Sequence, residues 1–308
     1  MGSILIVINK KINVNGVDIA YQLHGDEQAP VILLVHGLST PLTGWPIEMV
    51  DSFVEKGFQV LLLDNRDMGQ SEQLDHLPIP NLLWTVIKIK LGFTVKVPYQ
   101  LEDMMADTLA LLDALSIEKV HLVGASMGGM IAQLMAIHHQ ERLHSLTSIM
   151  STTGFKALPA IDTDVRRALA QKPASSNYKD RLNFHINKWR VIGSPKYPVN
   201  ETELTLRVSK LLERGISGKG TLRQMLAILV ASDRTKRLKS VLTPTLVIHG
   251  DSDALVNCQG GIATADAIFN AKLRVYKGMG HDFPVQLIPR IVNDIIEHAK
   301  AVELSHEK

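Results

Sequence analysis

One serine of the sequence stands where its hydroxyl could act as a nucleophile. Residues 119–139 read KVHLVGASMGGMIAQLMAIHH, so Ser126 lies between a β-branched apolar run and a stretch of helical character. A G-x-S-x-G pattern between a strand and a helix is typical of a nucleophile elbow, in which the flanking glycines, here Gly124 and Gly128, permit a tight turn. A serine alcohol is a poor nucleophile near neutral pH, so it needs a general base that a carboxylate orients. The pattern therefore predicts that a histidine and an acid follow in the chain.

The remaining sequence supplies both groups, in the order acid and then histidine. The apolar run 245–249 is followed by GDSD (250–253), and the run 273–276 is followed after one residue by GMGH (278–281). Both motifs follow predicted strands, and the carboxyl ends of strands are the edge of an open α/β sheet where sites form. We predict that His281 is the base. The acid could be presented from Asp251 or from Asp253, because the two lie on the same loop.

Two backbone N–H groups are expected to stabilise the oxyanion that forms when the serine attacks. One comes from the residue after the nucleophile, Met127, and the other comes from the loop after an earlier strand. That loop reads His36-Gly37-Leu38 after the apolar run 31–35, and we assign Leu38 as the second donor. His36 is expected to support the loop and not to transfer a proton.

The elements that must position these residues follow the pattern of an α/β fold. Asn15-Gly16 separates the strand-like segments 4–14 and 17–23, which indicates an antiparallel hairpin. Short continuous apolar runs then alternate with helical segments, as in a parallel sheet covered on both faces. These runs lie at residues 31–35, 60–63, 120–123, 146–150 and 245–248.

The alternation lapses between residues 154 and 239. Four mostly helical stretches follow one another there, at residues 162–170, 179–192, 201–214 and 221–230. We predict a helical cap over residues 154–239, inserted into a core made of residues 1–153 and 240–308.

Composition excludes several classes of function. The net charge of +2 comes from 33 basic and 31 acidic residues without a basic block, so no nucleic-acid partner is expected. The lone Cys258 excludes an internal disulfide or a multi-cysteine metal site. No H-E-x-x-H or comparable spacing indicates a metal site, and we predict that the protein uses no metal.

The apolar run 4–8 is too short for a signal sequence and is read as a strand, which favours a cytoplasmic location.

Residues 79–99 form an apolar insertion, IPNLLWTVIKIKLGFTVKVPY. Lys88 and Lys90 argue against a membrane span. The segment could be a lid that walls an acyl pocket through Leu83 and Trp84, an interfacial helix that touches lipid, or simple packing beneath the cap.

Five ordered motifs together resemble the α/β-hydrolase family, in particular the bacterial carboxylesterase-like branch that includes aclacinomycin methylesterase. The motifs are HG (36–37), DNRDMGQS (64–71), GASMGG (124–129), GDSD (250–253) and GMGH (278–281). The resemblance implies an α/β-hydrolase fold and no cofactor. One departure is Asp67, where many members carry glycine in a loop that supports the structure.

The resemblance also decides between the two candidate acids. In the family the acid follows the glycine after two variable residues, which implies Asp253 as the acid of the triad. Asp251 is then expected to bond its own loop or the backbone N–H groups around Ala254, a common role for aspartate in turns.

The predicted function is hydrolysis of a small-molecule carboxylic ester through an acyl-enzyme on Ser126. The resemblance argues against haloalkane dehalogenase and epoxide hydrolase chemistry, because those relatives use aspartate at the elbow. A C–C bond hydrolase with the same triad and a non-catalytic ligand-binding member of the fold are the alternatives.

Overall fold

The computed structural model describes residues 9–159 and 161–306 of the 308-residue chain. Its centre is an eight-stranded sheet in the order β1-β2-β4-β3-β5-β6-β7-β8. The strands are β1 Lys10–Val14, β2 Val17–His24, β3 Val31–Val35, β4 Gln59–Leu63, β5 Val120–Ala125, β6 Leu143–Ile149, β7 Thr245–Gly250 and β8 Lys272–Tyr276. Parallel pairing joins neighbouring strands from β4 through β3, β5, β6 and β7 to β8. Antiparallel pairing joins β1 to β2 and β2 to β4. The predicted mostly parallel sheet opened by a hairpin is confirmed.

The opening hairpin depends on its two-residue turn. Val14 pairs with Val17, and Asn15 and Gly16 between them have φ values of 53° and 75°. Positive φ at both central residues is what a type I′ turn requires, and Asn-Gly adopts it at low cost. The part of the first predicted strand at residues 4–8 lies outside the described residues.

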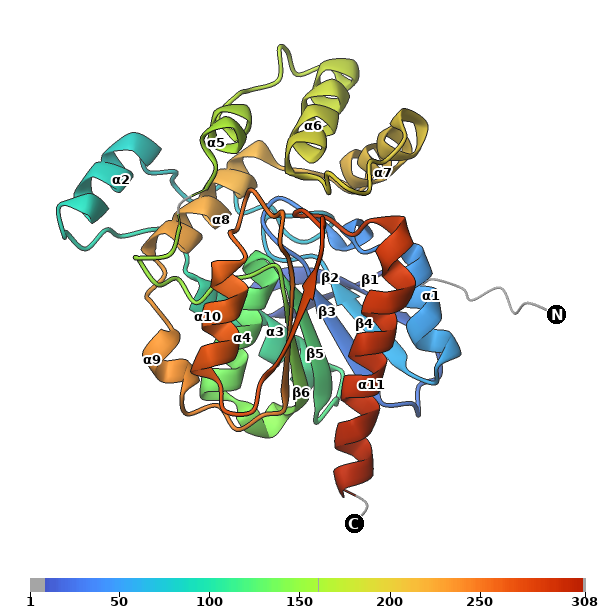
Figure 1. The fold of residues 1–308 in the computed structure, drawn as a ribbon. Coiled ribbons are helices and arrows are strands. Elements are labelled where there is room, and N and C mark those ends of the chain that lie inside the picture. Colours follow the sequence, from blue (N-terminus) through green and yellow to red (C-terminus); the bar gives the residue numbers. More distant parts are fainter. Residues whose placement is uncertain (1–8, 160, 307–308) are drawn as a thin grey trace.

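Eleven α-helices are present in the described chain. They are α1 Ile47–Glu55, α2 Leu82–Lys90, α3 Leu101–Ala114, α4 Met127–His138, α5 Thr163–Leu169, α6 Tyr178–Ile192, α7 Glu201–Arg214, α8 Gly218–Val230, α9 Thr235–Leu238, α10 Gln259–Ala267 and α11 Ile288–His306. Short 3₁₀ helices occur at Leu42–Gly44, Gln140–Arg142 and Val285–Leu287. Helices α3, α4 and α10 cover one face of the sheet, and α1 and α11 cover the other (Figure 1).

This double cover explains the continuous apolar runs of the central strands. In β3, Leu33 and Val35 pack in the cluster with α3 and α4, while Ile32 and Leu34 pack in the cluster with α1 and α11. Successive side chains of a strand point to opposite faces, so a strand buried on both faces needs apolar residues at every position.

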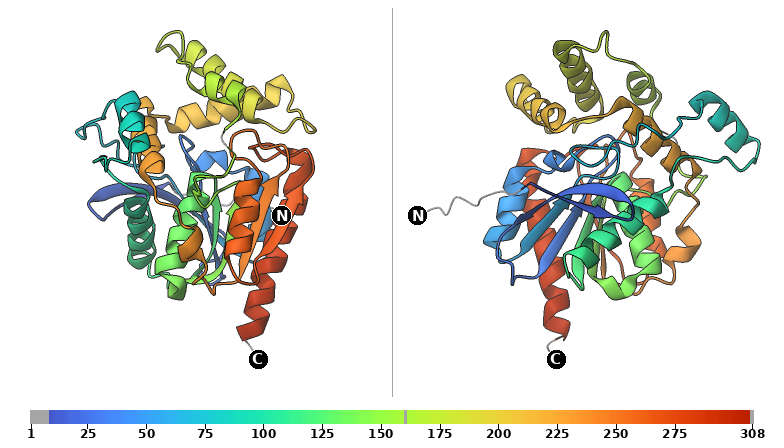
Figure 2. Two further views of the ribbon diagram at one scale, coloured as in Figure 1. Left: turned by 60° about the vertical axis from the view of Figure 1, so that its left-hand side comes forward. Right: turned by 180° about the vertical axis from the view of Figure 1, so that it is seen from behind.

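Helices α5 to α9 occupy the chain between β6 and β7, where the helical insertion is predicted. Helices α5, α6 and α7 lie over one end of the sheet, as Figures 1 and 2 show from three sides. Helices α6 and α7 bury a small cluster of their own, which contains Ile186, Leu204, Val208 and Leu212. The four predicted helical stretches are confirmed as α5 to α8, and the four-residue α9 is an addition.

Helix α2 lies within the insertion at residues 79–99. It packs beside α8 and stands at the outer edge of the molecule (Figures 1 and 2). Within the described part of the chain, no helix is both long and apolar enough to span a membrane.

Candidate active site

Ser126 sits in a strained turn between β5 and α4. Its backbone has φ 56° and ψ −120°, a conformation that non-glycine residues rarely adopt. A Cβ at Gly128 would lie 2.0 Å from the Val35 carbonyl oxygen, and a Cβ at Gly124 would lie 2.3 Å from the Gly128 carbonyl oxygen. Both glycines of the G-x-S-x-G pattern are therefore required by close backbone approach, as an elbow demands.

The structure brings Ser126, His281 and Asp253 together from three separate loops. Nε2 of His281 lies 3.0 Å from Oγ of Ser126, and Nδ1 of His281 lies 2.7 Å from Oδ2 of Asp253. His281 is 6% exposed and Asp253 is 5% exposed, so little water competes for these hydrogen bonds. Each residue follows the carboxyl end of a parallel strand, β5, β8 or β7. The arrangement can pass a proton from the serine hydroxyl to an imidazole that a carboxylate orients.

Asp253 is held in its ionised form. Its burial would raise the pKa of the carboxyl, but the charge of His281 and hydrogen bonds from His249 and His281 lower that pKa below its ordinary value. The other oxygen, Oδ1, accepts the N–H groups of Leu255 at 2.9 Å and Val256 at 2.8 Å. The carboxylate therefore has a fixed orientation towards His281.

His249, the last residue before Gly250 in β7, is a second histidine beside the acid. Its Nε2 lies 2.8 Å from the Val256 carbonyl oxygen and 3.4 Å from Oδ2 of Asp253, and the side chain is fully buried. His249 therefore contacts the acid loop at Val256 and at the same carboxylate oxygen that His281 contacts.

Asp251 bonds the neighbouring loop instead of the histidine. Its Oδ1 accepts the N–H of Gly278 at 2.6 Å and the hydroxyl of Ser252 at 2.8 Å. Of the two alternatives expected for Asp251, the bond within its own loop is present. The N–H groups of Leu255 and Val256 donate to Asp253. Asp251 thus joins the acid loop to the loop that carries His281.

The loop assigned to the oxyanion lies directly against the nucleophile. A Cβ at Gly37 would stand 2.8 Å from Cβ of Ser126, so glycine permits this close approach. Leu38 follows in the same loop and is half-buried. Met127 is the first residue of α4, and the first N–H groups of a helix have no acceptor within it.

His36 is a buried neutral ring that packs beside the oxyanion loop. Burial lowers the pKa of His36 to about 3, so the imidazole is uncharged near neutral pH. Its Nδ1 accepts the N–H of Gly37 at 2.7 Å, and its ring stands edge-on to Trp45 with 5.0 Å between the ring centroids. These contacts suit support of the loop and offer no path for proton transfer to Ser126.

Helix α8 reaches the oxyanion loop through residues that the sequence analysis missed. The N–H of Ser39 donates to Oε1 of Gln224 at 3.1 Å, and the hydroxyls of Ser39 and Thr221 lie 2.8 Å apart. Gln224 is fully buried, and its Nε2 donates to the Arg66 carbonyl at 2.9 Å. Ser39 has φ 59°, so these bonds hold the residue after Leu38 in an uncommon conformation.

The chain after α6 contacts the histidine loop in a similar way. The Ser194 hydroxyl donates to the buried Asp282 carboxylate and accepts the Gly280 N–H at 2.8 Å. The N–H of His281 donates to the Ile192 carbonyl at 2.8 Å. The helical insertion therefore fixes the loop that carries His281 as well as the oxyanion loop.

Asp67, the departure from the family pattern, is the centre of a buried network. It has φ 67°, which explains why glycine is common at this position. Its carboxylate receives two hydrogen bonds from Arg223 of α8, at 2.7 and 2.6 Å, and one from the Tyr99 hydroxyl at 2.8 Å. The Leu74 N–H adds a fourth at 2.7 Å. Both charged side chains are fully buried, so the pair joins α8 to the core.

We expect Arg223→Met to lower the free energy of unfolding by about 3–5 kcal/mol, because it leaves a buried carboxylate without its cation. Urea unfolding followed by circular dichroism measures this loss. The control is Arg190→Met, which removes an ion pair with Glu201 whose side chains are 54% and 69% exposed. Such an exposed pair contributes about 0–1 kcal/mol. Equal losses in the two variants would contradict a structural role for the Asp67–Arg223 pair.

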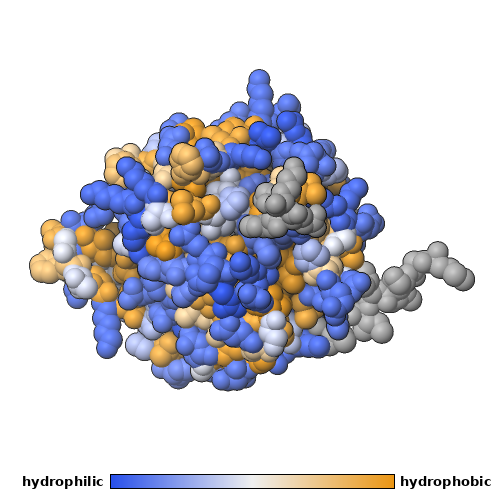
Figure 3. All heavy atoms as spheres, turned by 90° about the horizontal axis from the view of Figure 1, so that it is seen from below, coloured by the Kyte–Doolittle hydropathy of each residue, from blue (hydrophilic) through white to orange (hydrophobic). Residues whose placement is uncertain are grey.

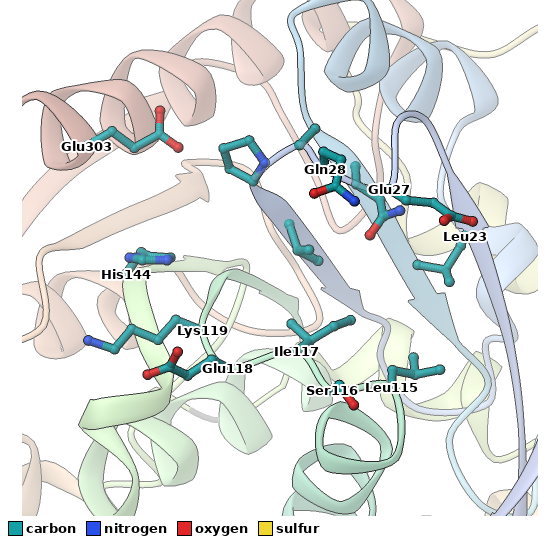
Figure 4. Close-up of a pocket in the computed structure, with 14 residues that line it drawn as sticks. Leu23, Glu27, Gln28, Leu115, Ser116, Ile117, Glu118, Lys119, His144 and Glu303 are labelled. Carbon is teal, nitrogen blue, oxygen red and sulfur yellow. The ribbon is translucent and has the colours of Figure 1, made fainter.

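A surface pocket of about 970 Å³ lies away from the triad. It is lined at the amino-terminal ends of β3 and β4 by Val31 and Gln59. Figure 4 shows its polar lining, including Glu118, Lys119 and His144. None of its lining residues belongs to the candidate active site. Among the described residues, no group of three or more His, Cys, Asp or Glu side chains could hold a metal ion.

Two curated proteins are similar in sequence to most of this chain. Rhodomycin D methylesterase DnrP of Streptomyces peucetius is 26% identical over 301 residues, covering 90% of this chain and 93% of that protein. A 2-hydroxy-6-oxononadienedioate/2-hydroxy-6-oxononatrienedioate hydrolase of Klebsiella pneumoniae is 26% identical over 269 residues, covering 83% of this chain and 82% of the other.

A solved structure supports the same fold. The 2-hydroxy-6-oxo-6-phenylhexa-2,4-dienoate hydrolase of a Rhodococcus species matches with a TM-score of 0.74 at 19% identity, covering 96% of this chain and 99% of the other. The family model described as alpha/beta hydrolase fold matches residues 30–286, which include every strand from β3 to β8 and all three residues of the triad. The chain therefore belongs to the alpha/beta hydrolase fold family.

Proposed function

We propose that the protein is a serine hydrolase of carboxylic esters. The observation that carries the proposal is the continuous hydrogen-bonded series from Ser126 through His281 to Asp253, with 3.0 and 2.7 Å between the bonded atoms. Nucleophilic catalysis by a serine needs a serine, a histidine and a carboxylate that are hydrogen-bonded in this order and shielded from water.

The proposed reaction has two steps. Oγ of Ser126 attacks the ester carbonyl carbon while Nε2 of His281 takes the hydroxyl proton, and the alcohol leaves with that proton. Water then attacks the acyl carbon while His281 takes a proton from it. The bond between the acyl carbon and Oγ of Ser126 breaks, His281 gives that proton to Oγ, and the acid is released. The N–H groups of Leu38 and Met127 stabilise both tetrahedral oxyanions, each contributing about 3 kcal/mol. Asp253 keeps the hydrogen on Nδ1 and stabilises the imidazolium.

The helical insertion is proposed to act as a cap that shapes the substrate pocket. Under this proposal residues 1–153 and 240–308 form the core and residues 154–239 form the cap. Its contacts with Ser39 and Gly280 support the division, because one inserted segment reaches both loops that flank the nucleophile. The substrate is a small-molecule ester, and the chemistry requires no cofactor.

Similarity to the methylesterase favours an ester as the substrate over other acyl compounds. That relative covers 90% of this chain, and its name specifies removal of a methyl ester. A methyl ester has a small alcohol side, so the cap would have to accommodate mainly the acid side.

A second candidate function is hydrolysis of a C–C bond. The observation that favours it is the 26% identity to a 2-hydroxy-6-oxononadienedioate/2-hydroxy-6-oxononatrienedioate hydrolase, which covers 83% of this chain. The third reading, a ligand-binding protein that retains the triad without turnover, has no comparable support among these relatives.

A substrate panel separates the three readings. We expect kcat/KM on p-nitrophenyl acetate, p-nitrophenyl butyrate and methyl esters to exceed that on a vinylogous 1,5-diketone by at least about tenfold. The Ser126→Ala protein, purified in the same way, measures the contaminating background. A higher value on the diketone would assign C–C hydrolysis, and background rates on every substrate would favour the ligand-binding reading.

A further inference from the structure

Helix α2 and the residues after it expose large apolar side chains to solvent. Leu83 and Leu91 are each 68% exposed, Trp84 is 61% exposed and Phe93 is 63% exposed. Seen from below, hydrophobic side chains gather at the left-hand edge of the molecule, where α2 lies in Figure 1 (Figure 3). A contiguous apolar surface of this kind on a globular protein marks an interaction site.

The helix is apolar on both of its sides, and the protein covers one of them. At 100° per residue, Leu83, Trp84, Ile87 and Leu91 fall on one side of the helix. The opposite side carries the buried Thr85, and Leu82 lines a small pocket of about 210 Å³ together with Leu222 and Leu226 of α8. Packing against α8 therefore accounts for the inner side, and among residues 9–159 and 161–306 nothing comparable covers the outer side.

The exposure of the outer side argues against two of the alternatives for this segment, a wall of an acyl pocket and simple packing beneath the cap. Side chains that are 61% and 68% exposed do not wall a pocket, so Trp84 and Leu83 do not line an acyl site in this structure. Simple packing also fails to explain them, because they lie on the side of α2 away from α8.

The charged side chains of the segment that carries this apolar surface have one sign. Lys88, Lys90 and Lys96 are exposed, and the sequence holds no acidic residue between Asp75 and Glu102. On the helical wheel, Lys88 and Lys90 flank the outer apolar side on its two edges. Lysines beside an apolar surface with an exposed tryptophan match the interface of an anionic lipid bilayer.

We propose that the outer side of α2 docks on the surface of an anionic membrane. Leu83, Trp84, Leu91 and Phe93 enter the boundary between headgroups and acyl chains, and the lysines contact the anionic headgroups. The helix has nine residues and is about 14 Å long, far short of a bilayer core, so docking is peripheral. A second copy of the chain fits this surface less well, because a two-fold contact would bring the lysines of both copies together with no acidic partner in the segment.

The test is co-flotation of the full chain with liposomes of phosphatidylcholine and phosphatidylserine in a 70:30 ratio. We expect binding at low salt that weakens as salt is added and is much weaker on phosphatidylcholine alone. Leu83→Ser/Trp84→Ser should lower the partition coefficient by about 30-fold, because two apolar anchors are lost. Lys88→Gln/Lys90→Gln should lower binding to the anionic vesicles and reduce its dependence on salt.

The matched control is Leu242→Ser/Phe269→Ser. These two side chains are 79% and 72% exposed and lie outside α2, so their loss should leave vesicle binding unchanged. Thermal unfolding by circular dichroism confirms that each variant is folded, and this check does not depend on the proposed esterase activity. No binding by the wild type, or equal binding by the α2 and control variants, would overturn the proposal. A dimer in size-exclusion chromatography that Leu83→Ser/Trp84→Ser abolishes, without vesicle binding, would assign the surface to a second copy instead.

Discussion

Replacing Ser126 by alanine is expected to lower kcat on p-nitrophenyl butyrate by a factor of about 10⁴ to 10⁶ while leaving the protein folded. The triad acts as a unit, so removing the nucleophile removes nearly all of its contribution. Alanine keeps the Cβ that the backbone at φ 56° already tolerates, and the change deletes a single oxygen whose partner is His281. The expected loss of rate is therefore chemical and not structural.

The rate is measured under saturating substrate, and the urea midpoint of the same preparation shows that the fold is retained. The midpoint should stay close to that of the wild type, because no apolar contact is removed. A variant that is folded and retains a rate within about tenfold of the wild type would contradict the assignment of Ser126.

Asp253→Asn is expected to lower kcat by a factor of about 10² to 10⁴. The amide cannot provide the negative charge that stabilises the imidazolium, and it favours the wrong tautomer of His281. The lowered pKa of Asp253 indicates that the carboxylate is charged throughout the working pH range. The buried 2.7 Å bond to Nδ1 of His281 is the contact that the substitution disrupts.

Asp251→Asn is the matched control for this substitution. It lies on the same loop and also accepts a short backbone hydrogen bond, but its partner is Gly278 and not His281. We expect Asp251→Asn to cost some stability and far less rate than Asp253→Asn. If both variants are folded and the order of their kcat values is reversed, Asp251 is the acid.

The three residues proposed for the triad could be picked out from the sequence because each belongs to a short local pattern. The elbow at Ser126 needs glycine on both sides, and the strand before it is visible as a β-branched run. The hairpin at Asn15-Gly16 and the four main helices of the insertion were predicted for the same reason, since turn residues and helical periodicity are local properties.

The supporting residues could not be predicted, because their roles depend on contacts between distant parts of the chain. Gln224 accepts a hydrogen bond from the N–H of Ser39, which is 185 residues away in sequence. The sequence of α8 around Gln224 shows only the pattern of an ordinary apolar helix. Arg223 pairs with Asp67 across 156 residues. A single sequence carries no signal for such pairs, whereas the unusual acid at Asp67 was at least visible as a departure from the family.

The segment at residues 79–99 shows a different limit of prediction from sequence. Its apolar composition is compatible with a lid, an interfacial helix or packing beneath the cap, and the sequence does not decide among the three. The structure places Thr85 inward and Leu83 and Trp84 outward, so one side packs on α8 and the other remains exposed. The distinction depends on where α8 lies, which is a tertiary property.

Labelling with a serine-directed fluorophosphonate tests the central claim, that Ser126 is an activated nucleophile, most directly. Trypsin releases residues 120–142 as one peptide, and Ser126 is the only residue with a hydroxyl side chain in it. We expect one adduct per chain by intact mass, located on that peptide, with no adduct in Ser126→Ala and much slower labelling when His281 is replaced by alanine. An adduct on another peptide, or no adduct on a preparation that hydrolyses esters, would contradict this claim.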